Sequence, residues 1–195
     1  MRVTLETGRW KTRRDLPVWV ALAVLLIAGW ELKSSVEDRR AAFADPTGTL
    51  RVQYPFAWLA VPGSTALLDV SDPRSGAGVA TRLIVTKTPR PADQAAGDIA
   101  NGEILRRAQQ LNMYRALSAE PAKVAGKDAV AVSYAFVADP HEAALELQRI
   151  PVVVRGLEIV IPAGDIVYRI DFRADTAVFD AARPTLDRIL RDVKL

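Results

Sequence analysis

The chain has 195 residues, no cysteine and one histidine, and its formal net charge is +3. The absence of cysteine excludes disulfides, thiolate nucleophiles and cysteine-bound metals. Residues 1–15 carry five basic and two acidic residues, so residues 16–195 carry 21 of each sign and are electrically balanced. This balance gives no support to a nucleic-acid partner, which would need a concentrated basic face.

The first predicted element is a transmembrane helix over residues 16–32. This segment has one charged side chain, Glu31, in 17 residues, and it would span roughly 25 Å, at the short end of what crosses a bilayer. Pro17 suits the first turn of a helix, and tryptophans lie near both ends, where aromatic rings favour the headgroup level. The residues assigned to the membrane anchor are Leu16, Pro17, Trp19, Leu25, Leu26 and Trp30.

The charges before this helix set its predicted orientation. Positive residues favour the cytoplasmic side, so residues 1–15 are predicted to be a cytoplasmic basic tail and the rest of the chain to lie outside. The use of Arg and Ala with few Lys is associated with G+C-rich bacterial genomes. The expected location is therefore a bacterial membrane, with the domain on its periplasmic or lumenal side. The charges that carry the orientation are Arg9, Lys11, Arg13 and Arg14.

Two other interpretations of the apolar segment stay open. A cleaved signal peptide has the same basic and apolar regions. However, the nearest small-x-small site, Ala42–Ala44, follows the apolar run by about twelve residues, which is far for cleavage. A buried core helix would need partner helices, and the sequence predicts none beside it. The sequence favours a retained signal anchor.

A tether over residues 33–46 and one extracytoplasmic domain over residues 47–195 are predicted to follow. The turn signal Asp45–Gly48 marks the boundary between them. Helices are predicted over residues 92–111 and 176–192, and the second is expected to split at Pro184. Apolar periodicity predicts strands over residues 49–54, 56–61, 66–70, 81–88, 114–120, 129–137, 152–161 and 166–173.

Side-chain patterns predict local details of these elements. A loop is expected over residues 121–127, a bulge at Gly156 and a hairpin turn at Pro162–Asp165. The helix over 92–111 is expected to bury one face, made of Ala100, Ile104, Ala108 and Leu111. The last strand is expected to place Ile166, Tyr168, Ile170 and Phe172 inside and Arg169, Asp171 and Arg173 outside.

Strands, a long helix, more strands and a terminal helix predict an α+β fold, in which helices pack on an antiparallel sheet. The opening Leu50–Trp58, with its strand, Tyr-Pro and Trp, resembles the start of the PsbP/Mog1-like superfamily. The Gly126–Ala129 turn, the hairpin that ends in Tyr168–Phe172 and the terminal helix agree with it. The resemblance covers residues 47–195, and it implies an α/β/α sandwich and an accessory or assembly role without catalysis.

The search for chemistry finds no catalytic motif. His141, with Asp139 and Glu142 within reach, could ligate a metal, but exposed acidic loops have the same composition. The Gly76–Gly78 stretch lacks the Lys and the following helix of a P-loop. No enzymatic activity, cofactor or metal site is therefore predicted.

Four arginines are candidates for binding an anion or the carboxylate of a partner. The sequence favours a different interpretation, in which they lie on solvated faces near Asp171 and Glu103, where exposed ion pairs contribute little. The four candidates are Arg106, Arg107, Arg169 and Arg173.

The predicted function is that of a non-catalytic single-pass membrane protein, an accessory subunit or assembly factor of a bacterial membrane complex. The predicted partners are the lipid bilayer and other subunits of that complex, with no nucleic acid. The alternative is a membrane-tethered module that binds a small ligand or a divalent cation. Small residues in the anchor would let other helices pack closely: Ala21, Ala23, Ala28 and Gly29.

Overall fold

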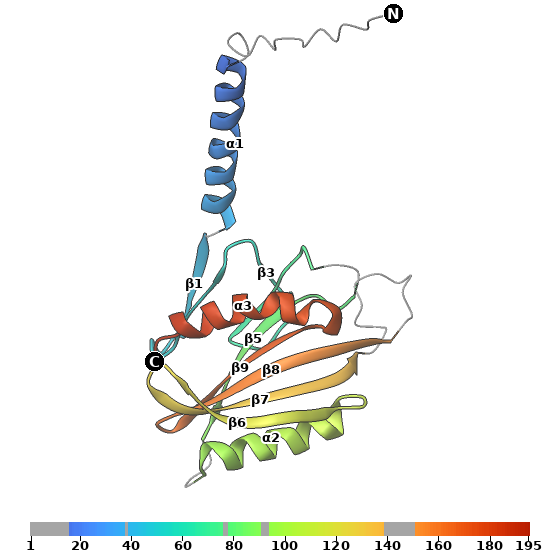
Figure 1. Cartoon of the computed structure of the whole chain (residues 1–195). Helices are drawn as coiled ribbons and strands as arrows, with labels where there is room; N and C mark the ends of the chain where they lie inside the picture. The colour runs from blue at the N-terminus through green and yellow to red at the C-terminus, as the bar shows by residue number, and fades with distance from the viewer. Residues whose placement is uncertain (1–15, 38, 76–77, 91–93, 139–150) are drawn as a thin grey trace, which may run out of the picture. The chain divides into compact units, whose positions relative to one another are not determined.

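The computed structural model describes residues 16–37, 39–75, 78–90, 94–138 and 151–195 (Figure 1). The chain divides into two compact units between Arg39 and Arg40. The first unit contains one described helix, and the second contains the strands and the other two helices.

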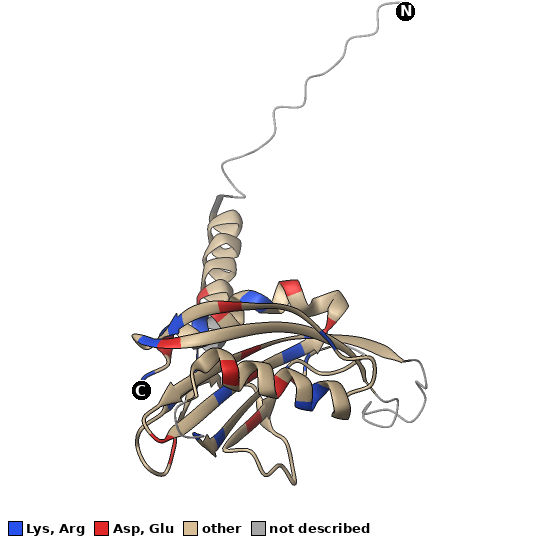
Figure 2. Ribbon diagram, turned by 90° about the horizontal axis from the view of Figure 1, so that it is seen from below, with Lys and Arg blue, Asp and Glu red and all other residues tan. Residues whose placement is uncertain are grey.

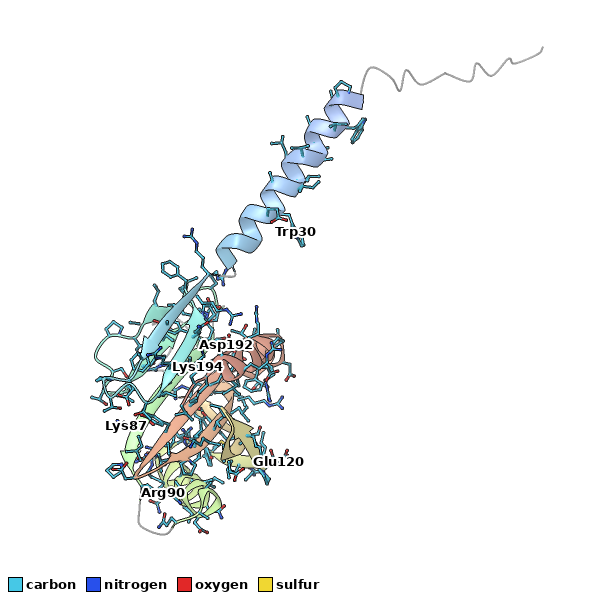
Figure 3. All side chains as sticks on the ribbon, turned by 90° about the vertical axis from the view of Figure 1, so that its left-hand side faces the viewer. Trp30, Lys87, Arg90, Glu120, Asp192 and Lys194 are labelled. Carbon is cyan, nitrogen blue, oxygen red and sulfur yellow. The ribbon has the colours of Figure 1, made fainter. Side chains whose placement is uncertain are left out.

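Helix α1, Leu16–Glu37, includes the predicted apolar segment. Every residue from 17 to 31 is exposed, including Trp19 at 66 % and Trp30 at 71 %, and side chains project from several sides of the helix (Figure 3). Among the residues that the structure describes, no helix has both the length and the hydropathy needed to cross a bilayer. A helix is therefore confirmed here, whereas its insertion into a membrane stays a prediction.

The second unit is built on a seven-stranded sheet with the strand order β3-β4-β5-β9-β8-β7-β6. All neighbouring strands in it run antiparallel. A separate two-stranded sheet pairs β1 with β2. The strands are β1 Arg40–Ala44, β2 Arg51–Pro55, β3 Leu59–Ala60, β4 Leu68–Ser71, β5 Arg82–Pro89, β6 Arg115–Val124, β7 Lys127–Ala138, β8 Val152–Ala163 and β9 Ile166–Asp175.

Two helices cover opposite faces of the large sheet (Figure 1). Helix α2, Ala96–Gln110, packs on β6, β7 and β8, and helix α3, Thr176–Asp192, packs on β2, β8 and β9. The Asp175 carboxylate caps α3 by accepting a hydrogen bond from the Ala177 N–H at 2.9 Å, which satisfies one of the unpaired donors at a helix start. The predicted α+β sandwich of an antiparallel sheet and flanking helices is confirmed.

Two segments that the sequence assigns to a tether and a loop form strands instead. Residues 40–44, expected in the tether, form β1, so the second unit begins at Arg40 rather than at residue 47. Residues 121–124, expected in a loop, continue β6. The turn that follows is confined to Ala125 and Gly126, which have φ angles of 50° and 75°, as a two-residue hairpin turn requires.

Two predicted irregularities are absent. Gly156 causes no bulge in β8, because it pairs in unbroken register with Tyr134 of β7 and Arg173 of β9. Pro184 does not split α3, which runs as one helix. Buried side chains on both sides of the proline, Phe179 and Leu186, hold the helix to the sheet and offset the backbone hydrogen bond that a proline removes.

The alternation of β9 separates an apolar face of the sheet from a charged one. Tyr168, Ile170 and Phe172 pack against α3 in the main core, as predicted. Arg169 and Asp171 were expected outside, but they lie on the other face, where side chains of α2 bond to them. The sequence pattern gave the face correctly and missed that a helix covers it.

Helix α2 meets the sheet with charges as well as apolar side chains. Ala100 is buried, and Ile104 and Leu111 are partly buried, as predicted. Ala108 is exposed instead, and the position that faces the sheet one residue earlier is Arg107. Glu103, four residues before it, is 5 % exposed. The predicted apolar face of this helix is therefore partly a charged face.

Candidate functional site

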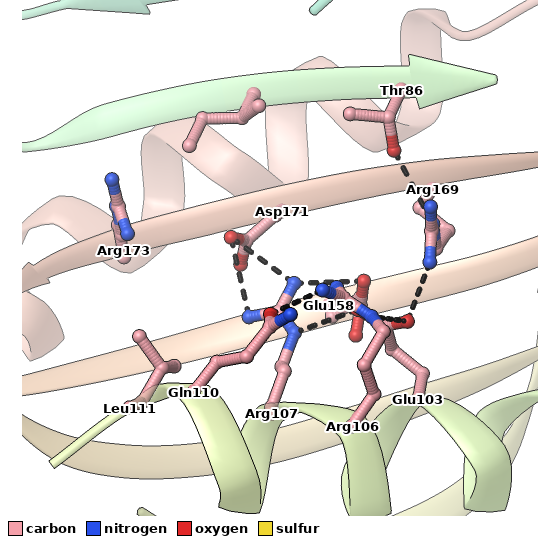
Figure 4. Close-up of a pocket in the computed structure, with 11 residues that line it drawn as sticks. Thr86, Glu103, Arg106, Arg107, Gln110, Leu111, Glu158, Arg169, Asp171 and Arg173 are labelled. Carbon is pink, nitrogen blue, oxygen red and sulfur yellow. Dashed lines mark hydrogen bonds and ion pairs between the residues drawn. The ribbon is translucent and has the colours of Figure 1, made fainter.

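A cavity of about 210 Å³ lies between α2 and the strands β5, β8 and β9 (Figure 4). Its lining combines four arginines with three carboxylates. Basic and acidic residues are interspersed over the ribbon, including α2 and the strands near it (Figure 2). The charged residues of this cavity, which we call the α2 pocket, are Glu103, Arg106, Arg107, Glu158, Arg169, Asp171 and Arg173.

The folding pattern brings these charges together from distant parts of the chain. On α2, Glu103 and Arg107 are four residues apart and therefore project from the same side of the helix. On the sheet, Glu158 of β8 and Asp171 of β9 are cross-strand partners, so their side chains leave the same face next to each other. The helix thus lays Arg107 over a pair of adjacent carboxylates.

Arg107 is the centre of the network. Its Nη2 donates to Glu158 Oε1 at 2.9 Å, its Nη1 donates to Asp171 Oδ2 at 3.4 Å, and its Nε donates to Glu103 Oε1 at 3.2 Å. Its side chain is 12 % exposed, and those of its three partners are less exposed still. The interpretation that these residues lie on solvated faces is therefore wrong for Arg107 and its carboxylate partners.

Glu103 gathers two further arginines. Arg169 Nη1 donates to Glu103 Oε2 at 2.5 Å, and Arg106 donates to both Glu103 oxygens. Arg106 also bonds to Gln110 and keeps about half of its side chain exposed, at 48 %. The predicted solvated position holds for Arg106 alone among the arginines bonded to Glu103.

A tyrosine of the sheet completes the network. Tyr134 of β7 donates its hydroxyl to Asp171 Oδ1 at 2.5 Å, and the Arg107 guanidinium lies 4.8 Å from the centre of the Tyr134 ring, within the range of a cation–π contact. The ring crosses β8 at Gly156, where an added Cβ would lie 2.3 Å from Tyr134 Cζ. Gly156 is thus required for the close approach of this ring.

Burial and neighbouring charges shift the pKa values of the two pocket glutamates in opposite directions. Burial raises the pKa of Glu158 to about 7, although the charge of Arg107 opposes the shift. Burial also works against the ionised form of Glu103, but the hydrogen bond from Arg106 and the charge of Arg169 lower its pKa. For Arg107, burial opposes the charged form, and the charges of Asp171 and Glu158 nevertheless raise its pKa.

Arg173 is the exception among these charges. Its Nε is buried without a hydrogen-bond partner, and within the described part of the chain it forms no ion pair. Figure 4 shows it on β9, at the edge of the cavity, with no dashed line to it. With every carboxylate ionised, four arginines and three carboxylates give the pocket a charge of +1. This arrangement suits the binding of an anion.

A second buried carboxylate lies outside the pocket. Asp45 accepts hydrogen bonds from Thr47 at 2.6 Å, Tyr168 at 2.5 Å and Lys87 at 3.0 Å. The bonds from Thr47 and Tyr168 lower the pKa of Asp45. Because its donors are all present within the domain, this site is structural and leaves no free group for a ligand.

The sequence identified all four arginines of the pocket but missed Glu158 and Tyr134. Glu158 is the one acidic residue between residues 152 and 161, and a lone carboxylate in an apolar strand is the signal that could have found it. His141, which was considered as a metal ligand and not predicted to be one, lies outside the described residues. Among the described residues, no group of three or more His, Asp or Glu could hold a metal ion.

No protein-family model matches the sequence, and no curated protein does either. Solved structures do match. The cyanobacterial PsbP (CyanoP) of Synechocystis sp. PCC 6803 superposes with a TM-score of 0.58 at 14 % identity, over 80 % of this chain and 92 % of its own.

The second unit has the PsbP/Mog1-like fold. A protein of unknown function and putative regulator, PA94 from Pseudomonas aeruginosa, matches with a TM-score of 0.53 at 13 % identity, over 79 % of this chain and 95 % of its own. LpqN, involved in cell envelope biogenesis of Mycobacterium tuberculosis, matches with a TM-score of 0.52 at 12 % identity, over 80 % and 90 %. The predicted resemblance is thus confirmed at the level of the fold.

Proposed function

We propose that this chain is a non-catalytic accessory protein that is attached to a bacterial membrane by α1 and docks on a membrane protein complex. The observation that carries the proposal is the character of α1. Residues 17–30 carry no polar side chain, and they remain exposed. An apolar helix of this kind is costly in water and calls for lipid or protein around it.

The length of the helix bears on how it would sit in a bilayer. The 17 residues from Leu16 to Leu32 would span roughly 25 Å, which is less than the hydrocarbon thickness of about 30 Å. Local thinning of the bilayer accommodates such a mismatch at modest cost, and Trp19 and Trp30 would anchor the two ends. The open surface at Gly29, where a Cβ would meet no atom within 4 Å, leaves room for another helix.

Two further observations support an extracytoplasmic accessory role. The basic residues before the helix, Arg9 to Arg14, favour a cytoplasmic N-terminus. LpqN, with the same fold, is involved in cell envelope biogenesis.

Membrane attachment is tested by fractionating cells that express the full chain. We expect the wild-type protein in the membrane pellet after washing with alkaline carbonate. Leu25→Arg combined with Leu26→Arg should move it to the soluble fraction, because charge at the centre of a spanning helix costs several kcal/mol. Leu105→Arg, at a residue of α2 that is 67 % exposed, is the matched control and should stay in the pellet. A wild-type protein that washes off would contradict attachment.

The accessory role is tested by purifying the full chain from native membranes in a mild detergent. We expect defined membrane proteins to co-purify in fixed proportion and to be lost with the double arginine variant. A protein that migrates alone in the detergent would contradict the role, even if the membrane attachment holds.

The second candidate is a tethered module that binds a small ligand. The unpaired Arg173 favours it, and each pocket carboxylate is already bonded to an arginine, which favours an anion over a divalent cation.

A further inference from the structure

We propose that the α2 pocket binds a single carboxylate group and that Arg173 receives it. The site is assigned from the cavity, from the unpaired guanidinium in its wall and from the charge of the lining. The proposal goes beyond the accessory role, and it does not depend on membrane attachment.

The first argument is the unsatisfied state of Arg173. A guanidinium carries five N–H donors, and a buried donor without an acceptor costs about 1–3 kcal/mol. Arg173 Nε is buried with no hydrogen-bond partner, and the side chain lines the cavity. An acceptor that enters the cavity would remove this cost.

The second argument is that the nearby carboxylates are already engaged. Asp171 accepts from Tyr134 on one oxygen and from Arg107 on the other. Across the sheet, the cross-strand neighbour of Arg173 is Arg82, and it holds Asp69 through two hydrogen bonds, of 2.6 and 2.5 Å. Among the residues that the structure describes, no carboxylate near Arg173 is therefore left to pair with it, so an acceptor that enters the cavity could bind it.

The size and charge of the cavity indicate the class of ligand. Its volume of about 210 Å³ is roughly seven times the share of a water molecule in the liquid and lies below the range of about 300–1,000 Å³ typical of ligand pockets. A net charge of +1 complements one negative charge, and the planar guanidinium fork matches a carboxylate through two parallel hydrogen bonds. A small monocarboxylate, or one Asp or Glu side chain of a partner, fits both the volume and the charge of the cavity.

The titration of Glu158 adds a second signature. Protonation of Glu158 as the pH falls through about 7 changes the pocket charge from +1 to +2, and a carboxylate should then bind more tightly at pH 6 than at pH 8. The groups that face Glu158 are Glu103, Arg106 and Arg107 of α2, Asp171 and Arg169 of β9, and Tyr114, between α2 and β6.

The experiment is an NMR titration of the full chain in detergent micelles with sodium butyrate, against sodium chloride at equal ionic strength. The Nε–Hε resonance of Arg173, identified by its loss in Arg173→Lys, should shift and saturate. Arg188, an exposed arginine of α3 that donates to Thr185, is the internal control and should not shift. The dissociation constant should be severalfold lower at pH 6 than at pH 8.

Two further ligands test whether the negative charge is required and whether the carboxylate is a free ligand or a side chain of a partner. Butyramide, which has the shape of butyrate without the charge, should cause no shift in the wild-type protein, and this control requires no variant to fold. N-acetylglutamate α-amide presents an acidic side chain as a partner protein would. An Arg173 shift with butyrate alone supports a free carboxylate ligand, and a shift with the blocked glutamate supports a side chain of a partner.

The proposal is overturned if neither carboxylate shifts the Arg173 resonance, or if butyramide shifts it as much as butyrate does. It is also overturned if butyrate shifts the resonances of Arg188 and Arg173 alike, since this would show general ionic binding. Arg173→Gln, compared with Arg188→Gln, should abolish the saturable response of neighbouring backbone amides to butyrate.

Discussion

The two faces of the large sheet are built from the same strands but bury different kinds of side chain. The face under α3 is apolar, with Tyr168, Ile170 and Phe172 packed against Phe179 and Leu186. The face under α2 has smaller apolar clusters and carries the buried charges of the pocket. Burying apolar side chains stabilises a fold. Buried ion pairs contribute little net stability, because the cost of removing the charges from water offsets their attraction. The difference indicates that the α3 face supplies most of the apolar burial, and the α2 face is the one for which we propose a binding role.

Two individual carboxylates, one bonded to each face, also differ. Asp45, which bonds to Tyr168 of the α3 face, has donors on several sides and a lowered pKa. Glu158, on the α2 face, shares one arginine with other carboxylates and has a raised pKa. A carboxylate of the first kind is satisfied in its charged state, and one of the second kind is held near its point of titration.

The largest expected effect comes from removing the shared cation of the α2 face. Arg107→Met leaves Glu158 and Asp171 buried without their counterion, and the free energy of unfolding should fall by about 3–5 kcal/mol. Arg183→Met is the matched control, because Arg183 pairs with an exposed Asp187, and it should cost less than about 1 kcal/mol. Urea unfolding of the two variants checks this, and equal losses would contradict the account.

On the α3 face, a substitution that leaves a cavity in the apolar core should lower the free energy of unfolding. Leu186 is fully buried in the main core, so Leu186→Ala should reduce the free energy of unfolding by about 2–5 kcal/mol. The control is Leu105→Ala on α2, at a side chain that is 67 % exposed, with an expected change within about 0.5 kcal/mol. If the leucine on α3 proves as tolerant as the exposed one, the α3 face is not the main source of stability.

The pH dependence of stability should distinguish the buried carboxylates by its sign. The folded pKa of Glu158, about 7, exceeds the usual value of 4.5, so its contribution is fully present below pH 4.5 and is lost as the pH rises through 7. The difference is at most about 3 kcal/mol. Unfolding measured from pH 4.5 to 8 should therefore show a decline that Glu158→Gln removes. A decline that persists in the variant would assign the titration to another group.

Carboxylates with a lowered pKa act in the opposite direction. Glu103 and Asp69 contribute stability above their usual pKa values and lose it as the pH falls through the lowered ones. Glu103→Gln should therefore change stability most near neutral pH and least in acid.

A smaller effect is expected at the glycine beneath the Tyr134 ring. Gly156→Ala places a methyl group where the ring lies, 2.3 Å from Cζ, and should cost about 1–3 kcal/mol. Gly102→Ala is the control on α2, where a Cβ meets no atom within 4 Å, and it should stabilise the protein by up to about 1 kcal/mol through helix propensity. Thermal unfolding of both variants tests this, and a stabilised Gly156→Ala would show that the ring is free to move.

Much of the fold could be predicted from the sequence, because apolar periodicity reports which side chains are buried. The strand over 166–173 and its buried face were found in this way. The pattern did not show that the charged face of β9 would be covered by α2. Arg107 meets Glu158 across 51 residues of sequence, and Glu103 meets Arg169 across 66, and no local pattern encodes such pairings. Whether α2 covers this face of the sheet depends on how the whole chain folds, and not on the local sequence of β9.

The most direct test of the division between the faces measures the free energy of unfolding of the full chain in detergent, with and without sodium butyrate. Arg173 has no ion-paired partner to lose among the described residues and a charge interaction with Asp69, so Arg173→Gln should have nearly the stability of the wild-type protein without butyrate. Butyrate should stabilise the wild-type protein by mass action and leave the variant unchanged. A variant that is less stable than the wild type, and that gains equally from butyrate, would contradict the account.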